Sequence, residues 1–277
     1  MAPDVFISLL AAGTLVGFVA GLVGIGGGVL IVPLLYLFYG YPAWSGVELS
    51  PSLQTVVSHA TSLLVIVPTA IVGAWSYHRA RLVDWRAVVP LAATAVLAAV
   101  VGAWVAPLLP AALLKVAFGT VLLVSAVRLL KKKRQATARG RRAPLALLLL
   151  SGCAVGFFSA LLGVGGGIVA IPILIHLVGL DLKKVAATSI GIIIFTATAG
   201  VLAYWVTGRD VAGLPPGSAG YVHVAAGVPI MMTSIFTAQV GARVNQRMNT
   251  RGLRIMFAVV FLLLGLRLVL QNAAALL

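Results

Sequence analysis

The sequence predicts an all-α polytopic membrane protein built from two homologous halves in inverted topology. Three observations lead to this prediction: an apolar composition, an internal repeat, and a different placement of basic loops in the two halves. Of the 277 residues, 61% are hydrophobic and only 9% are charged. Soluble domains carry about 25% charged residues. Most of this chain therefore lacks a water-facing surface, and we expect it to lie in a bilayer.

Ten apolar segments recur along the chain, and the longer ones suffice to cross about 30 Å of hydrocarbon. We expect them at 5–23, 29–39, 53–76, 86–106 and 112–130 in the first half, and at 144–162, 168–179, 186–206, 221–240 and 253–271 in the second. A basic segment with seven positive charges separates the halves. The chain thus divides into a first membrane repeat (1–130), a basic cytoplasmic linker (131–142) and a second membrane repeat (143–277).

The two halves repeat each other over nearly their whole length. Residues 17–35 read GFVAGLVGIGGGVLIVPLL and residues 156–174 read GFFSALLGVGGGIVAIPIL, an offset of 139 (156 − 17). A second block, Ala60-Thr61-Ser62, matches Ala187-Thr188-Ser189 at an offset of 127 (187 − 60). Internal repeats of this size are common in transporters.

Basic loops orient the halves, because cytoplasmic loops carry an excess of Lys and Arg. The basic loop follows the third apolar segment in the first half (residues 79–86) but the fourth in the second half (residues 243–254). This difference requires opposite orientations, with the linker in the cytoplasm and both termini external. Each glycine-broken pair, 5–39 and 144–179, then begins and ends on the same side. A parallel repeat would instead place residues 243–254 outside.

Each repeat contains a glycine run inside an apolar stretch, Gly24-Ile-Gly-Gly-Gly28 and Gly163-Val-Gly-Gly-Gly167. Each glycine in a helix costs up to about 1 kcal/mol relative to alanine, so the helix should break there. Unwound backbone at membrane depth must be buried in protein or line a cavity. The helix that follows each run presents free N–H groups and a positive dipole end, which favour an anion. The alternative is that the glycines only allow close helix packing.

We predict that the substrate binds between the two glycine turns, with hydroxyl groups closing the sides. The predicted substrate-binding residues are Gly26, Gly27, Gly28, Thr61, Ser62, Gly165, Gly166, Gly167, Thr188 and Ser189. Hydroxyls can donate to an oxyanion, or they bond to a neighbouring helix or to their own i−4 carbonyls. His59 is a candidate for a titrating group in the pathway, the alternative being a packing residue. A side chain at Gly27 or Gly166 is expected to block the anion.

Acidic residues are absent from the middle of the apolar segments. The five are Asp4, Glu48, Asp84, Asp181 and Asp210, all in or near expected loops. A passage without fixed negative charge suits an anion and offers no carboxylate for a proton relay or cation site. No cluster has metal-ligand spacing and no nucleophile is paired with a base, so we expect no metal, no cofactor and no enzyme. Nucleic-acid binding is not expected, since the basic residues lie mostly in short loops.

The paired Gly-Gly-Gly…Pro blocks, with Ala-Thr-Ser following in both halves, resemble the TauE/SafE sulfite exporter family of membrane permeases. The resemblance covers essentially the whole chain. It implies a secondary transporter that moves a small sulfur-containing oxyanion or organosulfonate, of the sulfite, sulfoacetate or thiosulfate class, across the cell inner membrane. An anion channel of the same fold is the alternative. The expected partners are the small anionic substrate and the lipid bilayer.

Overall fold

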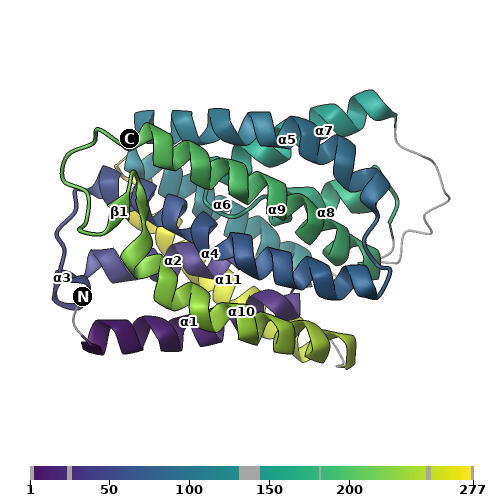
Figure 1. Ribbon diagram of the computed structural model, residues 1–277, viewed down its shortest axis with the longest axis horizontal. Helices are drawn as coiled ribbons and strands as arrows, with labels where there is room; N and C mark the ends of the chain where they lie inside the picture. Colours follow the sequence, from purple (N-terminus) through teal and green to yellow (C-terminus); the bar gives the residue numbers. More distant parts are fainter. Residues whose placement is uncertain (1–2, 24–26, 131–143, 181, 248–250, 276–277) are drawn as a thin grey trace.

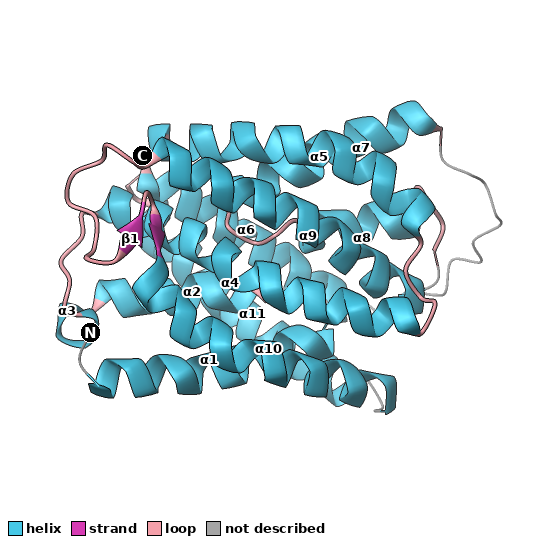
Figure 2. Cartoon of the chain, viewed as in Figure 1, coloured by secondary structure: helices cyan, strands magenta, loops and turns pink. Residues whose placement is uncertain are grey.

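The computed structural model describes residues 3–23, 27–130, 144–180, 182–247 and 251–275. Over these ranges the chain is almost entirely helical, with one short pair of strands (Figure 2). Five of the described helices are long and apolar enough to cross a membrane: α1, α4, α5, α9 and α10. The protein is therefore a helical, polytopic membrane protein, as the composition predicts.

Each of the ten predicted segments corresponds to one helix. The first half contains α1 (Pro3–Val23), α2 (Gly28–Gly40), α4 (Pro51–Arg79), α5 (Trp85–Val105) and α6 (Ala111–Leu130). The second half contains α7 (Leu145–Leu161), α8 (Gly167–His176), α9 (Leu182–Thr207), α10 (Val224–Arg247) and α11 (Arg251–Ala273). The remaining elements are short: α3 (Pro42–Ser45), the 3₁₀ turn η1 (Ala106–Leu108), and the antiparallel strands β1 (Ser218–Ala219) and β2 (Val222–His223).

The first helix of each half packs, in parallel, on the fourth long helix of the other half. Gly17 of α1 lies against Ser234 of α10, where an added Cβ would be 2.5 Å from the Ser234 carbonyl oxygen. Gly156 of α7 lies against Ala95 of α5, where a Cβ would be 1.9 Å from the Ala95 carbonyl oxygen. Only glycine allows two backbones this close. The two contacts occupy equivalent positions of the repeat. Gly17 matches Gly156, and Ala95 matches Ser234, both at the offset of 139.

The central helices α4 and α9 run antiparallel and are mostly buried (Figure 1). Gly73 of α4 lies beside Ile190 of α9, where an added Cβ would be 3.7 Å from the isoleucine side chain. Gly200 of α9 lies beside Leu63 of α4, where an added Cβ would be 2.6 Å from the leucine side chain. At the offset of 127 these are the same contact seen from each half. The fifth long helices, α6 and α11, also pack on each other.

The ends of the helices define two ends of the molecule. Both chain termini lie at the end that also carries α3 and the β1–β2 hairpin (Figure 1). The start of α7 lies at the opposite end, together with the loop between α4 and α5. We call the end that carries α3 and the β1–β2 hairpin the terminus end. The pair α1–α2 begins and ends there. The pair α7–α8 begins and ends at the opposite end.

Candidate functional site

A glycine in a left-handed conformation precedes each of the two broken helices. Gly27 has φ of 75° directly before α2, and Gly166 has φ of 83° directly before α8. Side chains rarely tolerate this region of backbone space, so glycine is required at both positions. The helices begin at Gly28 and Gly167, within one residue of the starts expected from the glycine runs.

The two glycine turns contact each other half-way along the central helices. A Cβ on Gly28 would lie 2.7 Å from Val164 Cα and 2.8 Å from the Gly163 carbonyl oxygen. A Cβ on Gly165 would lie 3.2 Å from Ile66 Cγ2, and Ile66 is near the middle of α4. The turns therefore meet backbone to backbone, deep in the helical bundle, as the sequence predicts for two breaks that enter from opposite ends.

Two hydroxyl groups donate hydrogen bonds to carbonyl oxygens of the second glycine turn, which is formed by residues 162–166 between α7 and α8. Ser62 Oγ donates to the Gly163 carbonyl oxygen at 2.8 Å. Thr196 Oγ1 donates to the Gly165 carbonyl oxygen at 2.9 Å. Both side chains are fully buried. Thr196 was not predicted, although a signal for it exists: Thr69 stands at the matching position of the first half, 127 residues earlier.

The predicted hydroxyls of Thr61 and Thr188 are directed elsewhere. Thr61 Oγ1 accepts a hydrogen bond from the backbone N–H of His223 at 3.0 Å. Thr188 Oγ1 accepts one from the backbone N–H of Asp84, also at 3.0 Å. The two threonines are repeat equivalents, and so are His223 and Asp84, at the offset of 139. Each threonine therefore supports the start of the fourth long helix of the other half.

The other predicted site residues are placed as follows. Ser189 is buried, and its Oγ has no hydrogen-bond partner among the residues described. Gly26 lies outside the described residues. A Cβ on Gly27 would be 2.9 Å from Ala20 of α1, and one on Gly166 would be 2.9 Å from Val155 of α7. A side chain at these two positions would therefore press on the preceding helix, not on the contact between the turns.

His59 lies directly against the second turn. A Cβ on Gly163 would be 2.5 Å from His59 Cα. The imidazole is fully buried, and its Nε2 is 2.5 Å from the hydroxyl oxygen of Tyr36 on α2. The backbone of Leu161 is beside it, but Nδ1 makes no hydrogen bond of normal geometry with a described residue. Tyr36 was not predicted, because its partner is 23 positions away on another helix.

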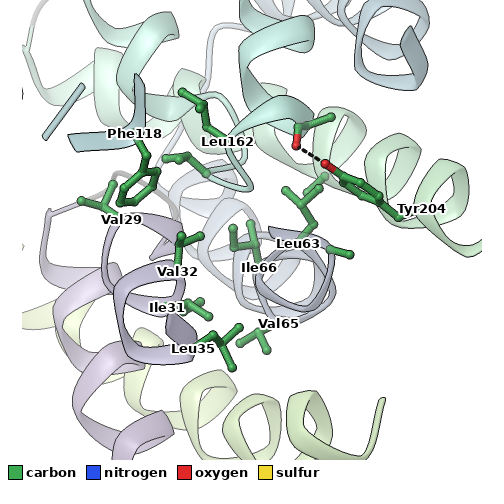
Figure 3. Packing of buried hydrophobic residues seen from close by; sticks show 14 of the residues in the cluster. Val29, Ile31, Val32, Leu35, Leu63, Val65, Ile66, Phe118, Leu162 and Tyr204 are labelled. Atoms are coloured by element: carbon green, nitrogen blue, oxygen red, sulfur yellow. Dashed lines mark hydrogen bonds between the residues drawn. The ribbon is translucent and has the colours of Figure 1, made fainter. Parts of the chain in front are cut away.

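Apolar side chains enclose the region around the turns. Figure 3 shows Val32 of α2, Ile66 of α4 and Leu162 of the second turn within one cluster, with Phe118 of α6 beside it. In the same view the Tyr204 hydroxyl donates to the Ala160 carbonyl oxygen at 2.9 Å, next to the second turn. The polar groups described near the turns include backbone amides and carbonyls, the hydroxyls of Ser62, Thr196 and Tyr204, and the His59 imidazole with its Tyr36 partner.

Carboxylates lie away from the turns wherever the structure describes them. Asp4 is in the first turn of α1, Asp84 directly precedes α5, and Glu48 and Asp210 lie in loops between helices. In the described ranges, no three His, Cys, Asp or Glu side chains gather as a metal site. The Asp84 carboxylate instead accepts a hydrogen bond from the Arg86 N–H at 3.1 Å. Because the Ser62, Thr196 and Tyr204 hydroxyls already donate to carbonyls, the donors that remain at the turns are the neutral backbone amides at the starts of α2 and α8.

The chain is similar to several proteins that are described as probable membrane transporters. It is 29% identical over 262 residues to a probable membrane transporter protein of Methanocaldococcus jannaschii, covering 93% of each chain. It is 28% identical over 263 residues to a probable membrane transporter protein of Haemophilus influenzae, covering 95% of this chain and 97% of the relative. It is 24% identical over 285 residues to the probable membrane transporter protein YunE of Bacillus subtilis, covering 96% and 98%. No solved structure matches the chain significantly.

The match to a family agrees with these relatives and with the paired glycine turns. Residues 9–268 match the family described as Sulfite exporter TauE/SafE. This range includes nearly all of the membrane helices. Its members are transporters and not enzymes. The chain therefore belongs to the TauE/SafE sulfite exporter family of membrane transporters.

Proposed function

We propose that the protein is a secondary transporter that moves a small sulfur-containing oxyanion or organosulfonate across the cell inner membrane. The observation that carries this proposal is the contact between the two glycine turns half-way along α4 and α9. The family description supports the sulfur chemistry, since it names sulfite export. The four carboxylates that the structure describes lie at helix ends and in loops, which supports an anion over a cation.

Backbone amides supply the proposed anion contacts. The N–H of Leu30 bonds to the Gly27 carbonyl, and the N–H of Val169 bonds to the Gly166 carbonyl. The amides that precede them at the start of α2 and α8 have no acceptor within the helix. Such amides, together with the positive end of the helix dipole, form an anion site. Neutral donors bind an oxyanion without the strong fixed charge that would slow its release.

The present arrangement corresponds to a closed site. Gly28 and the Gly163–Val164 backbone are in contact, which leaves no space for an anion between them. The turns must separate when the substrate passes. In many secondary transporters, one repeat rocks against the other around a fixed central site. Movement of the α2 start away from the second turn is a motion of this kind.

An inverted repeat provides the symmetry for alternating access. It is supported by the antiparallel run of α4 and α9 and by the reciprocal bonds from His223 to Thr61 and from Asp84 to Thr188. The positive-inside rule then assigns residues 131–142 to the cytoplasm and both termini to the outside.

Cysteine tagging tests this orientation. In a Cys153→Ala background, Ala43→Cys and Ala212→Cys should react with a membrane-impermeant maleimide added to intact cells, because both positions are at the terminus end. Ala80→Cys and Arg243→Cys, at the opposite end, should react only after permeabilisation. All four positions are exposed. Labelling of the last two in intact cells would contradict the proposed orientation.

Flux measurements test the substrate class and the carrier mechanism. Proteoliposomes should show saturable uptake of labelled sulfite, thiosulfate or sulfoacetate, and unlabelled substrate inside should accelerate it by counterflow. Uptake should persist without sodium, since none of the described carboxylates lies in the middle of a helix, where a sodium site would need it. Empty liposomes provide the control. Non-saturable flux without counterflow would indicate a channel, and absence of flux for every sulfur anion would contradict the substrate class.

A further inference from the structure

A cavity of about 210 Å³ opens between α2, α4, α6 and α11, away from the contact between the glycine turns. It lies at the terminus end, where α4 and α6 begin and α11 ends (Figure 1). Its polar lining consists of Tyr36, Gln54, Lys115, Arg267, Gln271 and Asn272. A cavity of this size holds several water molecules, and therefore also a small hydrated oxyanion.

The charge in this cavity is positive. Lys115 and Arg267 contribute one cation each, from α6 and α11, and none of the lining residues is acidic. Lys115 is partly buried, and its Nζ lies 5.4 Å from the centre of the Tyr36 ring. Arg267 Nε donates to Gln271 Oε1 at 3.4 Å, a weak contact that leaves the other guanidinium donors for a ligand. Two cations without a carboxylate counter-ion in one cavity favour an anionic occupant.

The base of the cavity connects to the glycine turns through a short chain of contacts. Tyr36 lines the cavity, and its hydroxyl lies 2.5 Å from His59 Nε2. The backbone of His59 touches Gly163, and Ser62 on the same helix holds the Gly163 carbonyl. Gln54 Nε2 donates to the Tyr36 carbonyl oxygen at 2.9 Å and fixes α2 to α4 at this level. The cavity and the second turn are thus separated by one tyrosine–histidine pair.

We propose that this cavity is an anion-binding vestibule at the terminus end, in which Lys115 and Arg267 hold a small oxyanion before or after it passes the Tyr36–His59 pair. This proposal rests on the proposed transport function, and it adds a binding site that is distinct from the turns. Cations in an open vestibule raise the local anion concentration by attraction over about a Debye length. The ligand chemistry is that of a mono- or dianionic oxyanion, either a free ion such as sulfite or the phosphate of a lipid headgroup.

Neutralising the cations tests the vestibule through transport kinetics. Lys115→Gln and Arg267→Gln should each raise the KM for sulfite, by roughly tenfold to a hundredfold if a charge-assisted hydrogen bond is lost. The kcat should change little, since the turns are untouched. Increasing salt should weaken sulfite uptake by the wild type, and less so by the variants. Lys115→Arg should restore most of the wild-type KM.

Arg209→Gln is the matched control. Arg209 is exposed at the same end of the molecule and lies over the Trp205 ring at 5.6 Å, outside the cavity. This variant removes the same charge but should keep the wild-type KM and salt dependence. Equal effects of Lys115→Gln, Arg267→Gln and Arg209→Gln would mean that these cations act only as general surface charge. That result would overturn the proposal.

Direct binding separates failure of the vestibule from failure of the transport function. Sulfite should raise the Tm of purified wild-type protein in detergent but have a smaller effect on Lys115→Gln. This result would support the vestibule even if flux of sulfur anions were absent. Wild-type flux combined with an unchanged KM and an unchanged Tm response in both variants would overturn the vestibule alone. Stabilisation by anionic phospholipid but not by sulfite would keep the oxyanion site but assign it to a lipid headgroup, and so overturn its role as a vestibule for the transported anion.

Discussion

Replacing Gly28 with alanine is expected to lower the rate of sulfite transport several-fold or more. A Cβ at this position would lie 2.7 Å from Val164 Cα and 2.8 Å from the Gly163 carbonyl oxygen, so the two turns could not close as they do here. Overpacking of a well-packed contact costs about 1–3 kcal/mol. That cost would lower the population of the closed arrangement roughly 5- to 150-fold. Uptake by proteoliposomes, normalised to folded protein, measures the effect.

Gly73→Ala is the control for this variant. Gly73 is also a buried helical glycine, on α4, but an added Cβ would meet only Ile190 side-chain atoms at 3.7 Å, an ordinary contact distance. This variant should transport at nearly the wild-type rate. Unchanged transport by a folded Gly28→Ala protein would mean that the contact between the turns has no part in the transport cycle.

Replacing Gly156 or Gly17 with leucine is expected to prevent normal folding. A Cβ on Gly156 would lie 1.9 Å from the Ala95 carbonyl oxygen, and one on Gly17 would lie 2.5 Å from that of Ser234. The obstructing atoms belong to helix backbone, so relief requires that α7 leave α5, or that α1 leave α10. We expect a loss of monodisperse protein on gel filtration and, for any protein recovered, a much lower Tm.

The matched controls add the same side chain to an exposed face of the same helix. Ala146→Leu on α7 and Ala11→Leu on α1 should leave yield and Tm near wild type, since both positions are exposed. Normal yield and Tm for both glycine variants would contradict the backbone contact between these helices.

The helices were predictable because their signals are local. Apolar runs locate ten of the described helices, five of them long enough to cross a membrane, and glycine runs place the starts of α2 and α8 within one residue. The β1–β2 hairpin was not predicted: Ser218–Ala219 lay between the expected segments and Val222–His223 lay inside the one expected at 221–240, because strands of two residues carry no periodic pattern. The role of Gly17 and Gly156 as contact points also cannot be predicted from the sequence of one helix alone. It becomes apparent only when the partner helix is known.

The candidate site was predictable in part. The glycine turns meet as expected, and Ser62 reaches the second turn, but Thr61 does not face it. Adjacent residues on a helix face different neighbours. The Ala-Thr-Ser motif alone does not show which of its two hydroxyls faces the turn. The sequence does not place Lys115 and Arg267 together. Their shared cavity depends on the packing of α6 against α11, which the sequence does not indicate.

The exchange of partners between the halves has a consequence for biosynthesis. α7 finds α5 already made when it leaves the ribosome. α1, in contrast, is synthesised well before its partner α10, which does not begin until Val224. At about 5–20 residues per second, the roughly 200 intervening residues take on the order of 10–40 s to translate. During this time the face of α1 that carries Gly13, Gly17 and Gly21 does not yet have α10 to pack on. α1 therefore waits for its packing partner much longer than α7 does.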